Sequence, residues 1–289
     1  KPYIGASRVV ASLMQFARST GTKKAIVADA QLYQALVLGE RFVRKGYVIV
    51  PVNTGGGIIA KAQADPDVEL VFATETIRTP EMRTVVQMLA SDYRTADVLV
   101  MIGLRYGPDT PTPSEYIYPR PGAIEVPLPV DVKSSQWALK VLSEKAKPEQ
   151  VPAAVRLAQA KSAAALLRKL LYERPDMYQI EDIEPFVREL ITIPAMTDSG
   201  LALARVVPTL GIQNHLINLL GDVRLPVETR RKALAAYSDH VKSFGSKLRG
   251  PDIVRLYDRY NASETEDVET QKILSAALDQ YELAVGKKK

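Results

Sequence analysis

The chain has 289 residues, of which 46% are hydrophobic and 25% are charged, so it can bury the apolar cores of two globular domains. It contains no cysteine, which excludes disulfide bonds, thiolate metal sites, iron–sulfur ligation and cysteine nucleophiles. The net charge of +5 arises from 38 basic and 33 acidic residues that alternate along the chain, which argues against a dedicated nucleic-acid surface.

The first half of the chain alternates between helical and strand-like patterns. Apolar residues at helical spacing predict a leading amphipathic helix over residues 7–18, which we interpret as the end of a repeat that begins upstream. Short apolar runs predict buried parallel strands over residues 24–28, 48–52, 68–73 and 98–102. Between them we expect helices over about residues 32–45, residues 58–64, and from Thr79-Pro80-Glu81 onwards. This alternation predicts a doubly wound α/β layer with its binding site at the carboxyl ends of the strands.

Residues 106–122 hold five prolines and three tyrosines, which predicts an extended, ordered loop in place of a fourth crossover helix. A fifth strand is expected over residues 123–126, followed by a helix that contains Trp137 and Leu139. Trp137 is the only tryptophan. Because it lies on an apolar helical stripe, we interpret it as a packing anchor rather than a ligand-stacking residue.

From Pro148 onwards the pattern becomes helix after helix, without strand-like alternation. Three stretches resemble one another loosely, and each has a helix, a polar or proline-bearing break and a second helix: residues 184–211, 213–245 and 252–281. Their length is typical of helical solenoid repeats. We therefore predict a leading helical segment over residues 1–22, an α/β domain over residues 23–146 and an all-α helical-repeat domain over residues 147–289.

Several short segments in the first half of the sequence resemble one protein family. They are Gly46-Tyr47-Val48, Asp65-Pro66-Asp67-Val68-Glu69-Leu70-Val71 and Arg94-Thr95-Ala96-Asp97-Val98. Together with the order of elements, they resemble the receiver domain of bacterial response regulators over about residues 23–144. In that family an acidic pair after the first strand binds Mg²⁺ and an aspartate that ends the third strand accepts phosphate. A Ser or Thr ends the fourth strand, and a Lys-Pro pair follows the fifth.

The residues at the corresponding positions are mostly unable to perform this chemistry. Asp29 matches one member of the acidic pair, but Ala30 occupies the other place. Thr74 stands at the phospho-acceptor position, and its hydroxyl cannot form an acyl phosphate. Gly103 stands at the Ser/Thr position, and Leu128 precedes proline where lysine belongs. The resemblance therefore implies a degenerate receiver-like domain that works without phosphorylation, metal or cofactor.

Other candidate sites are weaker. The glycines at positions 55–57 precede a helix, but they lack the dinucleotide and P-loop motifs and favour a tight turn over a phosphate cradle. The only histidines, His215 and His240, do not have the i, i+4 spacing of two ligands on one helix face. No G-x-S-x-G motif is present. Asp29 and Glu75 near the strand ends are better read as a polar rim than as a catalytic pair.

A basic cluster in the second half favours a solvated helix face over a phosphate-binding surface, because acidic residues lie among its members. The cluster consists of Arg224, Arg230, Arg231, Lys232, Lys242, Lys247 and Arg249. The segment from Pro226 to Leu234 resembles the start of a HEAT-type helix. That likeness concerns architecture only.

The two resemblances imply a bacterial HEAT-repeat protein with an embedded receiver-like domain, acting as a non-catalytic scaffold for protein partners. The candidate interaction surface consists of Tyr106, Tyr116, Tyr118, Trp137 and Leu139. An alternative is a sensor that binds a small ligand or nucleotide at the strand ends around Asp29, Asn53, Thr74 and Gly103. An enzyme is the third hypothesis. No apolar run reaches the roughly 20 residues of a membrane span, and a bacterial cytoplasmic or periplasmic location and the oligomeric state stay open.

Overall fold

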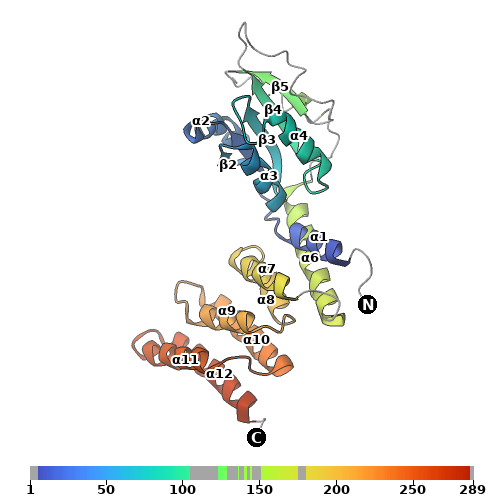
Figure 1. Ribbon diagram of the computed structural model, residues 1–289. Coiled ribbons are helices and arrows are strands. Elements are labelled where there is room, and N and C mark those ends of the chain that lie inside the picture. Colours follow the sequence, from blue (N-terminus) through green and yellow to red (C-terminus); the bar gives the residue numbers. More distant parts are fainter. Residues whose placement is uncertain are drawn as a thin grey trace. The chain divides into compact units, whose positions relative to one another are not determined.

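The computed structural model describes residues 6–104, 123–128, 151–174 and 180–286, together with Gln136, Lys140, Val141 and Glu144. The chain divides into two compact units (Figure 1). One unit is Arg18–Ala158, which holds the sheet, and the other comprises Lys1–Ala17 and Gln159–Lys289, whose described elements are helices. In the described part of the chain, none of the helices has both the length and the apolar character needed to cross a bilayer.

The sheet has five strands, and every pairing between neighbours is parallel. The strands are β1 (Lys24–Ala28), β2 (Val48–Val52), β3 (Val68–Thr74), β4 (Leu99–Leu104) and β5 (Ala123–Pro127). Their order is β2-β1-β3-β4-β5, so the direction of winding changes between β1 and β3. The predicted α/β layer is confirmed, with strand boundaries within two residues of those expected from the apolar runs.

Helices cover both faces of the sheet, which is why the strands are mostly apolar. On one face, α2 (Leu32–Val43) and the helical residue Val141 pack against a core that includes the rings of Phe42 and Phe72, whose centroids lie 5.3 Å apart. On the other face, α3 (Gly55–Ala64) and α4 (Met82–Ser91) bury their apolar stripes.

The glycine run at positions 55–57 is the first turn of α3, which corrects the predicted helix start near residue 58. Thr54 caps this helix, because its Oγ1 accepts a hydrogen bond from the N–H of Gly57 at 3.1 Å. A Cβ at Gly55 would overlap the carbonyl oxygen of Pro80. The glycine therefore permits a close approach between α3 and the loop before α4, a requirement that the sequence pattern alone did not reveal.

Two other helix ends differ from the predictions. Helix α4 begins at Met82 with Glu81 as its N-cap, whereas the helix was expected to include Thr79-Pro80-Glu81. The Thr79–Pro80 peptide bond is cis and lies in the preceding turn. Helix α2 ends at Val43 and not near residue 45, and Gly46, at a φ of 85°, follows in the left-handed region that terminates helices.

A buried carboxylate organises the amino-terminal edge of the sheet. Asp67, directly before β3, is fully buried and accepts hydrogen bonds from Ser19 Oγ (2.5 Å), Thr20 N (2.7 Å) and Thr20 Oγ1 (2.7 Å). Arg156, in the first turn of α6 (Ala153–Glu173), lies 3.8 Å from Asp67 and 2.8 Å from Glu69. Burial raises the pKa of Glu69, an effect that Arg156 opposes. This network attaches the start of α6 to the sheet.

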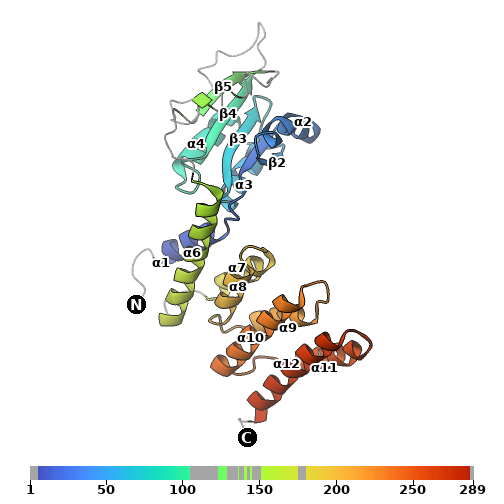
Figure 2. The same cartoon turned by 180° about the vertical axis from the view of Figure 1, so that it is seen from behind.

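The other unit contains α1 (Ala6–Ala17), the remainder of α6 and three helical pairs. The pairs are α7 (Ile180–Thr192) with α8 (Thr197–Ala204), α9 (Leu210–Gly221) with α10 (Val227–Phe244), and α11 (Gly250–Ala262) with α12 (Val268–Gly286). Both views show the pairs stacked in chain order, with α10 packed against α8 and α12 (Figures 1 and 2). The three predicted stretches overlap these pairs, although α9 begins at Leu210, within the first stretch. Helices α10 and α12 both begin with Val-Glu-Thr.

A buried glutamine and histidine join α9 and α10 to the segments that precede α9 and follow α10. Gln213 Oε1 accepts from the N–H of Lys247 (2.8 Å) and its Nε2 donates to the carbonyl of Gly245 (2.9 Å), which fixes the orientation of the amide. The same Nε2 lies 3.0 Å from His240 Nδ1, so Nδ1 accepts. His240 Nε2 then carries the proton and donates to the carbonyl of Val207 at 2.8 Å.

This network predicts that acid destabilises the helical pairs. Burial lowers the pKa of His240, so the folded state favours neutral imidazole. The stabilising contribution is complete above the unfolded-state pKa of about 6.5 and is lost as the pH falls toward the lower folded-state value. We expect the free energy of unfolding to decrease between about pH 7 and pH 5. Urea titrations at several pH values should show a weaker dependence in His240→Gln, and an unchanged dependence would contradict the assignment.

The phenol of Tyr237 on α10 predicts a stabilising substitution. This residue is fully buried, and its hydroxyl has no hydrogen-bond partner among the residues that the structure describes. Because an unsatisfied buried hydroxyl is unfavourable, Tyr237→Phe should raise the free energy of unfolding by about 1 kcal/mol. Thermal unfolding tests this against Tyr257→Phe, which loses the 2.7 Å bond to Glu282 and should not stabilise. A lower free energy of unfolding in Tyr237→Phe would contradict the prediction.

Candidate functional site

The carboxyl edge of the sheet brings together the predicted site residues. Asp29 follows β1, Thr74 is the last residue of β3, Gly103 lies in β4 and Leu128 follows β5. Thr74 and Gly103 are direct neighbours in the register of β3 and β4. The side chains of Asp29 and Thr74 are in contact, with 2.9 Å between Asp29 Oδ2 and Thr74 Oγ1.

Both oxygens of the Asp29 carboxylate are already hydrogen bonded within the protein. Oδ1 accepts from the N–H of Gln31 at 2.9 Å, and Oδ2 accepts from Thr74 Oγ1. Thr74 is fully buried, and its hydroxyl also lies 2.7 Å from Thr76 Oγ1. Thr76 in turn accepts from the N–H of Ala30 at 3.3 Å. The three side chains form a closed polar network that ties the ends of β1 and β3 together.

The two remaining positions of the predicted site, Gly103 and Leu128, lie in apolar surroundings. A Cβ at Gly103 would lie 3.0 Å from the ring of Phe72 and 3.1 Å from Leu128, so a larger residue would have to displace one of them. Leu128 donates its N–H to the carbonyl of Leu104 at 2.7 Å and packs against the core that α2 covers. Neither position offers a polar group from its side chain.

The network predicts a moderate loss of stability in Thr74→Val. Valine has a similar shape but no hydroxyl, so Asp29 Oδ2 would lose its donor in a buried site. We expect the free energy of unfolding to fall by about 1–3 kcal/mol, as is typical when a buried acceptor is left unsatisfied. Thr76→Val is the matched control and should cost less, because Thr76 is only partly buried. Urea unfolding measures both, and equal losses would argue against the Asp29 bond as the cause.

The backbone N–H groups of residues 55–57 are not free to bind phosphate. The first two donate to the carbonyls of Arg78 (3.0 Å) and Thr79 (2.9 Å), and the third donates to Thr54 Oγ1. A phosphate cradle needs such groups to point at the ligand. The glycines therefore serve the packing of α3.

The histidines, His215 on α9 and His240 on α10, do not form a metal site with neighbouring ligands. Within the described ranges, no three His, Asp or Glu side chains are grouped closely enough to hold a metal ion. Burial lowers the pKa of His215, with nearby Arg188 acting in the same direction. His240 is committed to the network with Gln213.

The basic cluster is not a single solvated face, which corrects the prediction for Arg230. That side chain is 2% exposed, and its Nη1 donates to Thr270 Oγ1 at 2.5 Å. Its neighbours are exposed and paired: Arg231 with Glu269 at 2.5 Å and Lys232 with Asp198 at 2.9 Å. These cations join successive helical pairs, so they are not an array available to phosphates.

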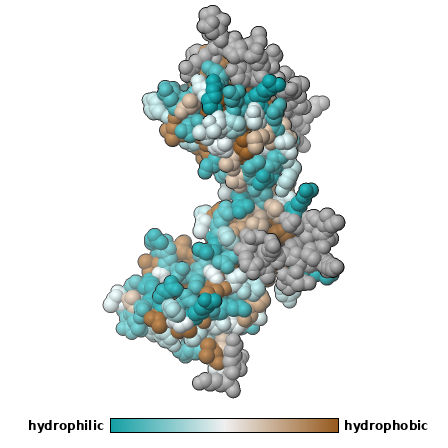
Figure 3. All heavy atoms as spheres, in the orientation of Figure 1, coloured by the Kyte–Doolittle hydropathy of each residue, from teal (hydrophilic) through white to brown (hydrophobic). Residues whose placement is uncertain are grey.

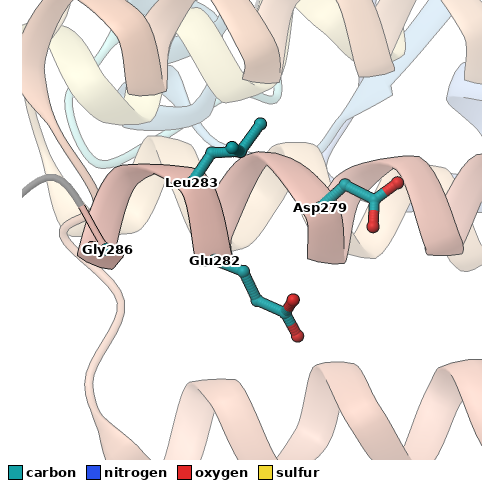
Figure 4. A pocket seen from close by; sticks show the side chains of 4 residues that line it. All are labelled: Asp279, Glu282, Leu283 and Gly286. Atoms are coloured by element: carbon teal, nitrogen blue, oxygen red, sulfur yellow. The ribbon is translucent and has the colours of Figure 1, made fainter.

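A shallow depression near the end of α12 is lined by Asp279, Glu282, Leu283 and Gly286 (Figure 4). Its two carboxylates do not converge, since Glu282 points away from Asp279 and Leu283 (Figure 4). Glu282 accepts a hydrogen bond from Tyr257 OH. The depression therefore lacks the convergent polar groups of a catalytic or ligand site.

The residues of the candidate interaction surface lie outside the described part of the structure. This predicted surface consists of Tyr106, Tyr116, Tyr118, Trp137 and Leu139.

Glu125 in β5 was not singled out from the sequence, although an acid inside an apolar strand is a usable signal. Burial raises its pKa to about 7, and its Oε1 has no partner among the described side chains and backbone groups.

No model of a known protein family matches the sequence, and no curated protein matches it.

Proposed function

We propose that the chain is a non-catalytic protein-interaction scaffold, in which residues 23–146 form a receiver-like domain that cannot be phosphorylated. The observation that carries the proposal is the closed network at the carboxyl edge. Thr74, at the position of the family's phospho-acceptor, is fully buried and its hydroxyl is bonded to Asp29. A threonine there cannot form an acyl phosphate, and Ala30 leaves one carboxylate fewer for Mg²⁺.

The strand order supports the receiver-like assignment. The order β2-β1-β3-β4-β5 is that of flavodoxin-like sheets, whose binding site lies at the switch point between β1 and β3. Here the polar side chains at that point bind one another and glycine and leucine fill the neighbouring positions. Because the Asp29 carboxylate and the Thr74 hydroxyl are bonded within the protein, a structural role for these two side chains is favoured over catalysis or ligand sensing.

The stacked helical pairs support an interaction role. Repeats of two helices bury a continuous core and present extended outer surfaces, which proteins of this architecture use to bind other proteins. We propose that α7–α12 form such a HEAT-type array. The helices of each pair pack on one another, and α10 contacts both α8 and α12.

The phosphorylation arm of the test uses the full chain incubated with acetyl phosphate and Mg²⁺. Intact-mass measurement should show no added phosphoryl group in the wild type. A phosphorylated product would contradict the proposal.

The binding arm is affinity capture by the full chain in its native source. It should recover at least one protein reproducibly. Failure to recover any protein, together with a melting shift caused by a nucleotide or metabolite, would favour the sensor alternative.

A further inference from the structure

A group of exposed apolar side chains in the sheet unit lies on α2. Five large apolar side chains of this one helix are between 42% and 71% exposed: Leu32, Tyr33, Leu36, Val37 and Val43. Figure 1 shows α2 at the outer edge of the sheet, beside β2, and the space-filling view shows hydrophobic surface on that side (Figure 3). A patch of this kind on one helix marks an interaction site more often than scattered single residues do.

The exposed residues form a stripe that the described elements leave uncovered. Helix α2 buries Ala35, Gly39 and Phe42 against the sheet, and it approaches β2 so closely that a Cβ at Gly39 would lie 2.8 Å from Ile49. The exposed apolar positions 32, 33, 36 and 37 recur at i, i+1, i+4 and i+5, so they share one side of the helix, next to the buried face. This helix therefore has two apolar faces, and only one of them is covered by the described parts of the chain.

The neighbouring edge strand is unsuited to receive an added strand. Val48 donates its N–H to Lys23 O and Val52 accepts from Asp29 N, so alternate residues of β2 bond to β1. The residues between them, Ile49 and Pro51, direct their backbone groups outward. Proline has no N–H, which leaves Ile49 as the one outward donor within β2. A helix on the α2 stripe is therefore a better occupant than a strand on this edge.

Charge indicates which kind of helix fits. The last turn of α2 and the residues after it carry Arg41, Arg44 and Lys45, and no ion pair engages any of them in the described part of the structure. Glu40 is the one acid on this segment. A second copy of α2 would bring these cations against the positive amino-terminal end of its partner helix in antiparallel packing, and against the partner's own cations in parallel packing, and both arrangements are unfavourable. An acidic helix would instead complement them.

We propose that the α2 stripe is a docking surface for an amphipathic helix of a partner protein, which places apolar residues on Leu36 and Val37 and acidic residues beside Arg44 and Lys45. This inference rests on the proposed scaffold function and assigns the kind of partner that one surface takes.

The test uses the full chain with a photo-crosslinking residue, Tyr33→p-benzoylphenylalanine, because Tyr33 is 71% exposed at the stripe. After irradiation in the native source, mass spectrometry of the crosslinked peptide identifies the occupant. We expect a segment with apolar residues at helical spacing and acidic neighbours. Leu36→Asp and Arg44→Glu should each reduce the crosslink at least tenfold, whereas Val254→Asp, at an apolar position on α11 that is also at least half exposed, should leave it unchanged.

Several results would overturn the inference. A crosslink between two copies of the chain would make the surface a self-association site, and a crosslink to lipid would make it a membrane contact. If the crosslinking yield did not change in Leu36→Asp and Arg44→Glu, the α2 stripe would not be part of the interface. If the chain captures a partner but position 33 never crosslinks to it, the docking inference fails while the scaffold proposal stands. If the chain captures no protein at all, the scaffold proposal fails, and the docking inference that rests on it fails with it.

Discussion

Asp67→Ala is expected to destabilise the sheet unit by about 3–5 kcal/mol, the cost typical of breaking a buried charged network by removing one partner. The side chain is fully buried and accepts three hydrogen bonds from Ser19 and Thr20. Without it these donors remain in a buried site, and Arg156 loses one of its two carboxylate neighbours. Asp67→Asn keeps one acceptor oxygen and should lose about half as much, by the same reasoning on buried hydrogen bonds.

Asp65→Ala is the matched control for this prediction. Asp65 lies two residues away and pairs with Lys24 at 2.7 Å, but its side chain is 27% exposed. A pair in contact with water contributes about 0–1 kcal/mol. Because a chain of two units need not unfold in one step, amide hydrogen exchange in β1 and β3 is the suitable measurement. Equal losses from Asp65→Ala and Asp67→Ala would show that burial of the network does not determine its contribution.

The sheet was predictable from sequence because its central strands are buried on both faces. Continuous apolar runs such as residues 98–102 favour a buried strand when turn residues bound them, and the structure confirms the strand assignments. Helix starts were harder to locate. The first turn of α3 consists of glycines, which have low helix propensity, and their place in the helix depends on the approach of Pro80 from a distant loop.

The position of the candidate site could be predicted from the sequence, but its hydrogen bonds and packing contacts could not. Counting residues from each strand end located Asp29 and Thr74 at one edge, because parallel strands end on the same side. The sequence does not reveal that Thr76 completes their network or that Leu128 packs beside Gly103. These contacts join segments distant in the chain. The same limitation explains why Arg230 was grouped with solvated cations: its burial depends on α12, which lies 40 residues further along the chain at Thr270.

Arg230→Ala is expected to cost about 2–4 kcal/mol, whereas the same substitution at the adjacent Arg231 should cost less than about 1 kcal/mol. Both arginines lie on α10 and both bond to α12, so helix propensity and the partner helix are matched. They differ in burial, since Arg230 is 2% exposed and fills space against Thr270, while the side chain of Arg231 is 55% exposed at its pair with Glu269.

Arg230→Met separates packing from hydrogen bonding at this junction. Methionine keeps an aliphatic stem of similar length but no donor, so it should recover the part of the loss that is due to the cavity. Hydrogen exchange of the α12 amides reports the junction directly, because α10 contacts α12. If Arg231→Ala opened α12 as much as Arg230→Ala, the exposed ion pair would be the main contact between the second and third helical pairs. The buried guanidinium would then contribute little to the cohesion of the array.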